Sequence, residues 1–371
     1  MTVAARAAIL GVGLIGGSLG MRWRRDGAVA QVVGWGRDAA RLRRAVELGA
    51  VDEGGTDLGA ALEGADVVVL AAPVRTCLAL GPDVARRAAP GALITDVAST
   101  KAELGAAMAA ALAARGPGAP SFIGGHPMAG AERAGVEAAD PYLFENAVWA
   151  LCPDAATPAG ALDRLRTLVE STGAHPVVLD PQGHDRRVAA ISHLPQLVAV
   201  ALAEAAGSAE AADPGLLALA GGGFRDTTRI AQSPAEMWLD VFATNRGPVL
   251  AQLDRLQEVL GALAAAVAGG DGEAVARHFA AAASARAQVP ARQKGLLPSY
   301  HDLVLVVPDR PGVVGGLCGA LGERGINVQD IEILRLREGE GGTLRLGFRT
   351  AEAAAAALEV LAALGYRVQR R

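Results

Sequence analysis

The first half of the chain alternates short apolar runs with segments whose apolar residues recur at helical spacing. The apolar runs lie at residues 7–10, 31–35, 66–72, 92–98, 122–125 and 147–152, and breaks that carry Gly, Asp or Pro separate them. Such alternation is typical of a parallel sheet with helices on both faces. A helical segment at 161–173 and a strand-like segment at 175–179 close this part, so we expect a doubly wound α/β domain over residues 1–180.

From Pro181 onward the pattern changes to helical spacing with almost no strand signal. The segments 186–206 and 248–268 have the apolar spacing of long helices. Pro195 lies inside the first of them and lacks an amide donor, so it should kink the helix or break its hydrogen-bond ladder. We expect an all-helical second domain over residues 181–290.

A Pro- and Gly-bearing stretch at residues 291–299 predicts a linker. Beyond it, strand-like segments at 302–308, 326–338, 343–349 and 366–371 flank helical segments at 313–325 and 351–365. The order is strand, helix, strand, strand, helix, strand, which is that of a split βαβ or ferredoxin-like unit. We therefore expect an α+β domain over residues 300–371.

Composition limits the class of protein. A chain of 371 residues is too long for one ordinary core, and 51% hydrophobic with 20% charged residues excludes disorder as the dominant state. The 35 basic and 39 acidic side chains give a formal net charge of -4, which offers no broad electrostatic footprint for nucleic acid. Small anionic substrates remain compatible with this balance, through local placement of Arg.

Cysteine usage and the apolar runs bear on location. Cys77, Cys152 and Cys318 are widely spaced with no CxxC motif, so the sequence supports neither a disulfide framework nor a structural metal site. It has no run of about 20 apolar residues free of charges and of Gly or Pro clusters, and its N-terminus lacks the pattern of a secretory signal. We expect a cytoplasmic protein without a membrane span.

A glycine motif follows the first predicted strand: Gly11-Val-Gly13-Leu14-Ile15-Gly16. Gly11 permits a tight turn, Gly13 lets the backbone approach a pyrophosphate, and Gly16 allows close packing of the following helix on the strand. The helix N-terminus would supply amide donors to the phosphates. The strand and helix on either side predict a Rossmann-like dinucleotide site, whereas the motif alone would indicate only a tight turn.

The residue after the second predicted strand bears on the choice of cofactor. NAD-selective proteins usually place Asp or Glu there to bind the ribose hydroxyls, whereas this chain has Gly36-Arg37. A guanidinium suits a 2′-phosphate, so we favour NADP over NAD, with use of both left open. The alternative is that Arg37 is a solvated cation at a helix end, and Asp38 is expected to cap the next helix.

Two further side chains are expected at the same edge of the sheet. Ser99 follows the strand at 92–98 and His126 follows the strand at 122–125, and open α/β sheets bind ligands beyond the carboxyl ends of their strands. A glycine-flanked imidazole there can accept a proton from a substrate hydroxyl as hydride leaves its carbon. The structural alternatives are a helix cap for Ser99 and a core position for His126.

An ordered set of motifs links these residues. GVGLIGGS, DVASTK, GGHPMAGAE, ISHLP and GGFRDTTRIAQSPAEMW, with Asn245 downstream, cover most of residues 7–290. In this order they resemble the prephenate dehydrogenase family, including its members that use arogenate. The resemblance implies an NAD(P)-dependent oxidative decarboxylation in tyrosine biosynthesis. Hydride would pass from the ring carbinol carbon to the nicotinamide while the ring carboxylate leaves as carbon dioxide, which converts prephenate to 4-hydroxyphenylpyruvate or arogenate to tyrosine.

The resemblance also implies roles by position. His126 resembles the residue that hydrogen-bonds the ring hydroxyl and receives its proton, and Ser99 the residue that orients this histidine beside the nicotinamide. Arg229 resembles the guanidinium that holds a substrate carboxylate, a contact that suits its planar fork. The other residues implied to contact substrate or support the pocket are His193, Asp226, Glu132 and Trp238. Without the resemblance, these positions are compatible with core or surface roles.

Three positions depart from the family pattern, and two other functions compete. Ala98 stands where Gly is frequent, Ala131 where Ser or Thr is frequent, and Gln196 where a second histidine is frequent, so prephenate and arogenate both remain open. A β-hydroxyacid dehydrogenase would place a catalytic lysine on a helix of the second half, where the chain has only Lys294, in the linker. A sensor that binds cofactor and amino acid without turnover is the third alternative.

The tail resembles an ACT domain, a module that commonly binds amino acids. The resemblance rests on Asp309-Arg-Pro-Gly312 after its first strand and Gly-Ile-Asn327 before its second. It implies effector contacts from Asp309, Gly312 and Asn327, and we expect an aromatic amino acid, tyrosine first, as the regulatory partner. A purely structural pairing module is the alternative. The long apolar helices and the tail indicate a homodimer.

Overall fold

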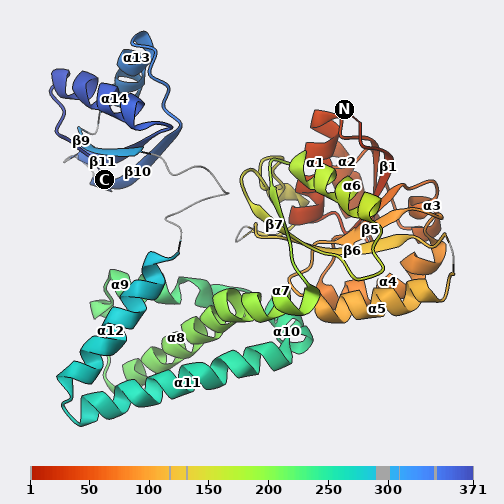
Figure 1. Cartoon of the computed structure of the whole chain (residues 1–371), viewed down its shortest axis with the longest axis horizontal. Coiled ribbons are helices and arrows are strands. Elements are labelled where there is room, and N and C mark those ends of the chain that lie inside the picture. The colour runs from red at the N-terminus through yellow and green to blue at the C-terminus, as the bar shows by residue number, and fades with distance from the viewer. Residues whose placement is uncertain are drawn as a thin grey trace. The chain divides into compact units, whose positions relative to one another are not determined.

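The computed structural model describes residues 2–116, 118–130, 133–289, 301–308, 310–337 and 341–370 (Figure 1). Contacts within the chain divide it into two units, Met1–Gly295 and Leu296–Arg371. The predicted linker 291–299 lies outside the described residues, as do Ala131 and two predicted site residues, Glu132 and Asp309.

The first unit is built on one eight-stranded sheet with the order β3-β2-β1-β4-β5-β6-β7-β8. Neighbouring strands run parallel except that β7 is antiparallel to β6. The doubly wound α/β class is confirmed, and the short edge strand β3, with the sequence EGG, has no apolar run that could have predicted it. The strands are β1 Ala4–Leu10, β2 Val29–Trp35, β3 Glu53–Gly55, β4 Val67–Leu70, β5 Leu93–Asp96, β6 Ser121–Pro127, β7 Val148–Cys152 and β8 His175–Val178.

Side chains of the same strands alternate between two cores. Ile9 and Val69 pack in the core that includes residues of α1, α2 and α6, while Leu10 and Leu70 pack in the core beside α4 and α5. Figure 1 shows these two groups of helices on opposite faces of the sheet. Because both faces are covered, the strands are apolar at nearly every position. The helices are α1 Leu14–Asp26, α2 Ala39–Glu47, α3 Leu58–Leu62, α4 Val74–Arg87, α5 Ala102–Ala113 and α6 Ala159–Glu170, with a 3₁₀ turn η1 at Val136–Ala138.

From Pro181 to Ala287 the chain is helical. Its first helix is continuous from α7 Pro181–Val188 through a π-helical turn, η2 Ala189–His193, into α8 Leu194–Ala212. The wide turn ends just before Pro195, where the missing amide leaves the regular ladder incomplete. The remaining elements are η3 Leu217–Leu219, α9 Gly222–Thr228, η4 Arg229–Gln232, α10 Ala235–Thr244, α11 Arg246–Ala268 and α12 Gly272–Ala287.

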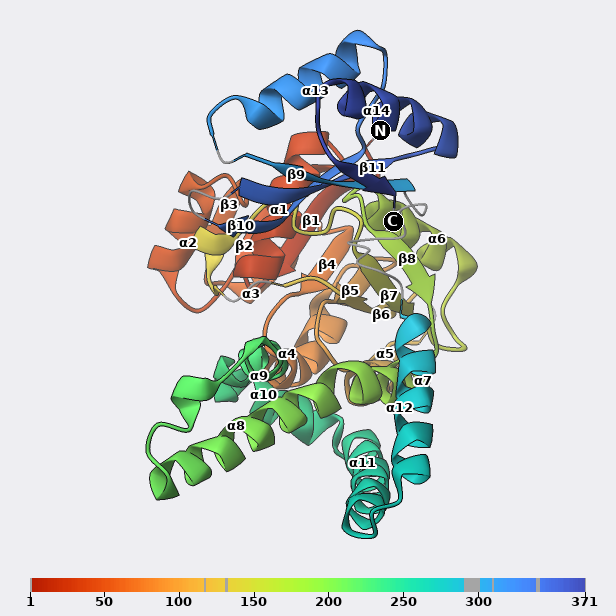
Figure 2. The same cartoon turned by 90° about the vertical axis from the view of Figure 1, so that its left-hand side faces the viewer.

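These helices bury few of their own apolar side chains. In α11 only Val249 and Ala266 are buried, α12 has no buried residue, and Phe279 is 71% exposed. Both views show α8, α11 and α12 extending away from the sheet (Figures 1 and 2). By length and composition alone, Pro181–Ala212 could also cross a membrane, a test that core helices of soluble proteins pass as well.

The second unit has the predicted order of strands and helices. Its elements are β9 His301–Val307, α13 Val313–Glu323, β10 Asp330–Arg337, β11 Gly341–Phe348, α14 Ala351–Ala363 and β12 Val368–Arg370. The strands form an antiparallel sheet with the order β10-β11-β9-β12. Alternate residues such as Leu303, Leu305 and Leu346 pack against Leu317 of α13 and Leu361 of α14. The ferredoxin-like class is confirmed.

Candidate active site

The turn between β1 and α1 has the shape that a bound pyrophosphate needs. Gly11 has a φ of +109°, and a Cβ there would lie 2.5 Å from the carbonyl oxygen of Ala71. A Cβ at Gly16 would collide with the backbone of Gly11, whereas at Gly13 it would meet nothing within 4 Å. Gly13 also precedes Leu14 and Ile15 of α1 without any side-chain cap, so the first amides of the helix stay available. This turn fits a dinucleotide.

Arg37 lies at the expected place beyond β2. Its side chain is exposed and forms no hydrogen bond or ion pair with the described residues. Asp38 accepts hydrogen bonds from the amides of Ala40 and Arg41 at 2.8 and 3.2 Å, and these bonds lower the pKa of its carboxyl group. The predicted cap of α2 by Asp38 is confirmed, and Arg37, next to it in the chain, is exposed.

His126 lies near the end of β6, at the same edge of the sheet as the glycine turn, and it is bonded to a second histidine. Its Nδ1 lies 2.9 Å from Nε2 of His184 on α7. Nδ1 of His184 lies 2.8 Å from Oδ1 of Asp185. His184 and Asp185 are 1% and 2% exposed, so water has little access to the chain of bonds. Three side chains from two distant segments therefore form one linear series.

The directions of these hydrogen bonds follow from the acceptors. Asp185 accepts the backbone N–H groups of Lys101 and Ala102, each at 2.8 Å, so its oxygens act as acceptors and the Nδ1–H of His184 donates to it. With its single ring proton on Nδ1, His184 offers a lone pair at Nε2, to which His126 donates through its Nδ1–H. The Nε2 of His126 is then unprotonated, which is the form a general base requires.

Ser99 does not cap α5. It is half-buried and its side chain forms no hydrogen bond with the described residues, so the structural alternative of a cap role is wrong. Asp185 provides the cap instead, from a helix 83 positions further along the chain. A cap supplied from another helix cannot be recognised from local sequence, because cap motifs involve neighbours in the chain. Ser99 also has no bond to His126, whose Nδ1 is bound by His184.

A second histidine site lies on the π-helical turn. Nδ2 of Asn245 donates to the backbone oxygen of Asp185 at 2.8 Å and to Nδ1 of His193 at 3.1 Å. His193 therefore carries its ring proton on Nε2, the opposite arrangement to His126. The ring of Trp238 lies edge-on to His193 at 6.0 Å, and its Nε1 is buried without a hydrogen-bond partner in the part of the chain that is described.

Burial keeps both histidines in the neutral form. Desolvation, with a contribution from the charge of Lys101, holds the pKa of His126 well below its ordinary value of 6.5. Desolvation also lowers the pKa of His193 to about 4, although Asp185 acts in the opposite direction. Near neutral pH the site thus offers one imidazole as a proton acceptor and another as a donor.

Arg229 and Asp226 are not joined to His126 by any contact among the described residues. Arg229 begins η4 and Asp226 lies on α9, and both are exposed. Gln196 of α8 donates from Nε2 to the backbone oxygen of Ile230 at 2.9 Å, which ties the turn that carries Arg229 to the helix that follows His193.

Sequence reasoning missed the supporting residues. From the sequence we predicted no function for His184 or Asp185, and we included Asn245 only in the ordered set of motifs. The available signal was a polar pair, His184-Asp185, just after Pro181 at the start of an apolar helical pattern. Because α7 also carries Gln182, Arg186 and Arg187, the sequence alone did not show that this pair is buried and bonded.

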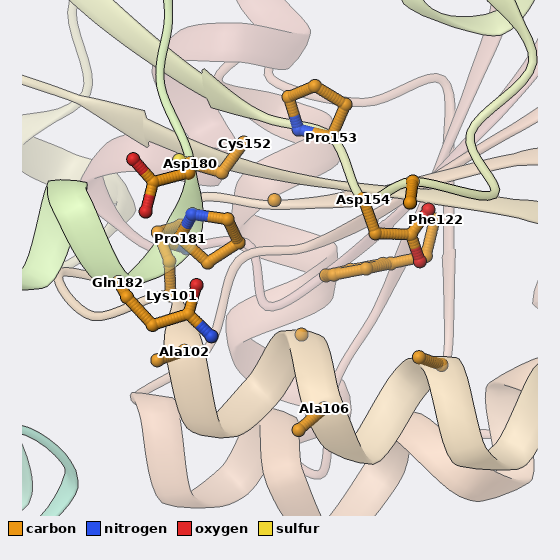
Figure 3. Close-up of a pocket in the computed structure, with 14 residues that line it drawn as sticks. Lys101, Ala102, Ala106, Phe122, Cys152, Pro153, Asp154, Asp180, Pro181 and Gln182 are labelled. Atoms are coloured by element: carbon orange, nitrogen blue, oxygen red, sulfur yellow. The ribbon is translucent and has the colours of Figure 1, made fainter.

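Two cavities flank this network. One of about 350 Å³ lies between α5, β6, β7 and the start of α7, with Lys101 and Cys152 in its wall (Figure 3). The other, of about 720 Å³, is lined by His184 and by Met128 to Gly130. His126, His193 and Arg229 line neither cavity. Within the described ranges no group of three or more His, Cys, Asp or Glu side chains could hold a metal ion.

In the second unit the expected effector residues lie apart. Gly312, with a φ of +88°, precedes the first turn of α13, and Asn327 follows the last. The helix between them has 11 residues and is thus about 16 Å long, so a single amino acid cannot contact both residues within one copy of the module.

Three family profiles match the chain. They are the nucleotide-binding domain of prephenate dehydrogenase over residues 19–178, the prephenate dehydrogenase dimerization domain over 180–281, and the ACT domain over 301–366. A prephenate dehydrogenase of Bacillus subtilis (strain 168) is 34% identical over 343 residues, which cover 92% of this chain and 91% of that protein.

Two solved structures are similar to about three quarters of the chain. The prephenate dehydrogenase of A. aeolicus in complex with hydroxyphenyl propionate and NAD+ has a TM-score of 0.71 at 30% identity, covering 77% of this chain and 98% of that chain. The arogenate dehydrogenase of Synechocystis has a TM-score of 0.67 at 31% identity, covering 76% and 99%.

Proposed function

The chain belongs to the prephenate dehydrogenase family and is an NAD(P)-dependent oxidoreductase, and from this premise we propose that it oxidises and decarboxylates prephenate with His126 as the base. One observation carries this assignment of the base. The series from Asp185 through His184 leaves Nε2 of His126 unprotonated, at the sheet edge where the glycine turn lies. Asp185 and His184 are positioning residues in this scheme, because they act through His126.

The chemistry divides between the chain and the cofactor. A nicotinamide dinucleotide held by the turn at Gly11 to Gly16 supplies the acceptor for the hydride. His126 Nε2 accepts the proton of the ring hydroxyl as the carbinol carbon becomes a carbonyl carbon. The bond to the ring carboxylate then breaks, carbon dioxide leaves, and the electron pair enters the ring, which aromatises as a phenolate. The phenolate oxygen takes the proton back from His126, which gives the phenol and restores the neutral imidazole. The desolvated surroundings of His126 favour its neutral form before substrate binds.

Substrate recognition would use donors, because prephenate carries two carboxylates. His193 presents Nε2–H, fixed by Asn245, and Trp238 has a buried Nε1–H that no described acceptor binds. We assign Arg229 to one carboxylate, since its planar guanidinium forms paired charge-assisted bonds, and Asp226 and Glu132 to support of the pocket. Ser99 would contact the cofactor and substrate from the end of β5.

A second substrate is supported by Gln196. A carbonyl oxygen can only accept a hydrogen bond, so the group of Gln196 that donates to the carbonyl oxygen of Ile230 is its Nε2 amide. The side-chain oxygen Oε1 then remains as a hydrogen-bond acceptor. An amide oxygen suits the ammonium group of arogenate better than the keto group of prephenate. Arogenate is therefore the alternative substrate, and it would give tyrosine directly.

Cofactor choice and assembly are further parts of the proposal. We favour NADP, with NAD also used. Arg37 is exposed just beyond β2, at the position where NAD-selective proteins usually have Asp or Glu. The exposed apolar side chains of α8, α11 and α12 fit a homodimer interface, since a helix face of this kind is normally covered. We place the enzyme in the cytoplasm. We also propose three domains, over residues 1–180, 181–290 and 300–371.

The tail is proposed to bind an aromatic amino acid near Gly312 and to lower the activity of the enzyme. If Asn327 also contacts the effector, a second copy of the module must contribute it, because the two positions lie at opposite ends of α13. Coupling to the active site then requires that the effector favours one arrangement of the subunits.

A direct assay tests the proposed function. Prephenate, arogenate and a β-hydroxy acid are each added with NAD or NADP, and both reduced-nicotinamide absorbance and released carbon dioxide are measured. Equal amounts of reduced nicotinamide and carbon dioxide from prephenate or arogenate support the proposal. Reduction without carbon dioxide would indicate simple alcohol oxidation, and no reduction with any substrate would indicate a sensor.

A further inference from the structure

A buried ion pair lies behind His126, and the mechanism above does not use it. The ammonium of Lys101 contacts Oδ2 of Asp96, and both side chains are 0% exposed. Desolvation offsets most of the attraction in such pairs, so a pair of apolar side chains of similar shape would stabilise the fold as well or better. Its position, rather than its strength, therefore points to its role.

The first link from this pair to His126 runs through the backbone. Asp96 accepts the amide of Ala98 at 2.9 Å with Oδ2 and the amide of Gly125 at 3.1 Å with Oδ1. Gly125 directly precedes His126, so the carboxylate at the end of β5 holds the segment of β6 on which the imidazole is mounted.

The two glycines before His126 make room for this arrangement. A Cβ at Gly124 would lie 3.0 Å from Cδ of Lys101, and a Cβ at Gly125 would lie 2.5 Å from the backbone oxygen of Asp96. Gly124 and His126 share one face of β6, because side chains two apart on a strand point the same way. The stem of Lys101 thus lies on the face that carries the imidazole, and Figure 3 shows it at the start of α5 beside that strand.

The second link runs through the helix that follows. The backbone amide of Lys101 donates to Asp185, which binds His184, which binds His126. One residue therefore supports both ends of the base: its side chain holds the backbone through Asp96, and its amide helps to hold the ring through Asp185.

We propose that the Lys101–Asp96 pair is a positioning element that fixes His126 and places a positive charge behind it, which disfavours proton uptake by the ring from solvent. This inference rests on the proposed function for its chemical consequence, but the effect on His126 is a property of the folded chain alone. Removal of the charge should let the ring take up protons from solvent more readily.

The charge of Lys101 acts among several other groups. The titratable groups around His126 are Lys101 at the start of α5, His184 and Asp185 on α7, His193 on η2, Asp96 on β5 and Cys152 on β7. Burial raises the pKa of the Cys152 thiol to about 12, so it is neutral. Asp96 and Asp185 are engaged by Lys101 and His184. Besides burial, the charge of Lys101 is the largest influence that lowers the pKa of His126.

The test removes both charges together. In the double variant Lys101→Met, Asp96→Asn no charge is left unpaired, and each new side chain keeps nearly the shape of the one that it replaces. We expect the pKa of His126, followed by ¹⁵N NMR of histidine-labelled protein and assigned with His126→Asn, to rise by on the order of one unit. The matched control is Arg24→Met, Asp52→Asn, which removes another pair in the same unit, with Arg24 Nε 2.7 Å from Asp52 Oδ1. It should leave the pKa of His126 unchanged.

The outcomes separate this inference from the proposed function. A pKa of His126 that is the same in the double variant and the wild type would overturn the role of the pair. A raised pKa with a matching upward shift of the acid limb of kcat/KM supports both proposals. A raised pKa with an unchanged acid limb supports the pair and counts against His126 as the base. If the double variant does not fold, Lys101→Met alone serves, because burial raises the pKa of Asp96 and favours its neutral form.

Discussion

The substitution His184→Asn should slow catalysis when His126 is present and have little effect when His126 has been replaced. His184→Asn keeps a polar group near Asp185 but is too short to offer an acceptor to Nδ1 of His126, which lies 2.9 Å from Nε2 of His184 in the wild type. His184 is 1% exposed, so water does not readily replace the lost acceptor. The ring of His126 is then free to place its proton on Nε2, where it blocks the base.

The structure sets the size of the effect. A buried donor that loses its acceptor costs about 1–3 kcal/mol. At about 1.4 kcal/mol per tenfold change in rate, we expect His184→Asn to lower kcat roughly 5- to 150-fold. The KM for substrate should change only a few-fold, since His184 faces the interior and not the reacting edge. His126→Asn should lower kcat by roughly 10² to 10⁴, because the base itself is lost.

A double-mutant cycle provides the assay. Steady-state rates are measured for the wild type, both single variants and the double variant, together with thermal unfolding and cofactor binding. In the background His126→Asn, the change at His184 should cost less than about twofold, which gives a coupling of about 1–3 kcal/mol. His175→Asn is the matched control, since this histidine begins β8 and forms no hydrogen bond with Asp185, His184 or His126. It should change kcat by less than about twofold in either background.

One result would contradict the proposed role of the hydrogen-bonded series Asp185–His184–His126. If His184→Asn lowers kcat by the same factor with and without His126, its effect is general, through stability or packing, and the series Asp185–His184–His126 has no special role. A wild-type rate in the single variant would lead to the same conclusion.

Four other predictions address separate parts of the molecule. Arg229→Ala should raise the KM for substrate roughly 10²-fold or more with a smaller change in kcat, and an unchanged KM would mean that another cation binds the carboxylate. Arg37→Asp should shift preference from NADP toward NAD, and a wild type that already prefers NAD strongly would contradict the role given to Arg37. Because the folded-state pKa of His193 lies near 4 and that of His126 also below 6.5, the unfolded chain binds more protons, so the free energy of unfolding should fall as pH decreases from about 6.5 toward 4. Urea unfolding at several pH values should show a loss of up to about 1.4 kcal/mol per pH unit for each histidine, and a flat profile would be inconsistent with buried neutral rings. A chain truncated near Pro298 should keep turnover and lose inhibition by tyrosine, whereas equal inhibition of both forms would place the effector in the active site.

Local chemistry determined much of this protein from sequence. The alternation of apolar runs predicted the sheet and all of its strands except β3, because side-chain periodicity follows directly from strand and helix geometry. The turn at Gly11 to Gly16 and the cap at Asp38 were predictable for the same reason, since steric limits and caps involve residues close in sequence. His126 could be placed at the ligand-binding edge because strand ends in a parallel sheet share one side.

Tertiary structure alone decided how His126 is supported. His184 is 58 positions from His126, and the amide of Lys101 is 84 positions from the carboxylate that binds it. Neither pairing leaves a periodic or local trace in the sequence, and the same holds for the cap of α5, which local sequence assigns to Ser99. These bonds form only when α7 docks against α5 and β7, because burial removes water as a competing partner and makes each unsatisfied polar group costly. The proposed base, His126, thus lies in a motif that can be recognised locally, whereas the position of its ring proton depends on long-range packing.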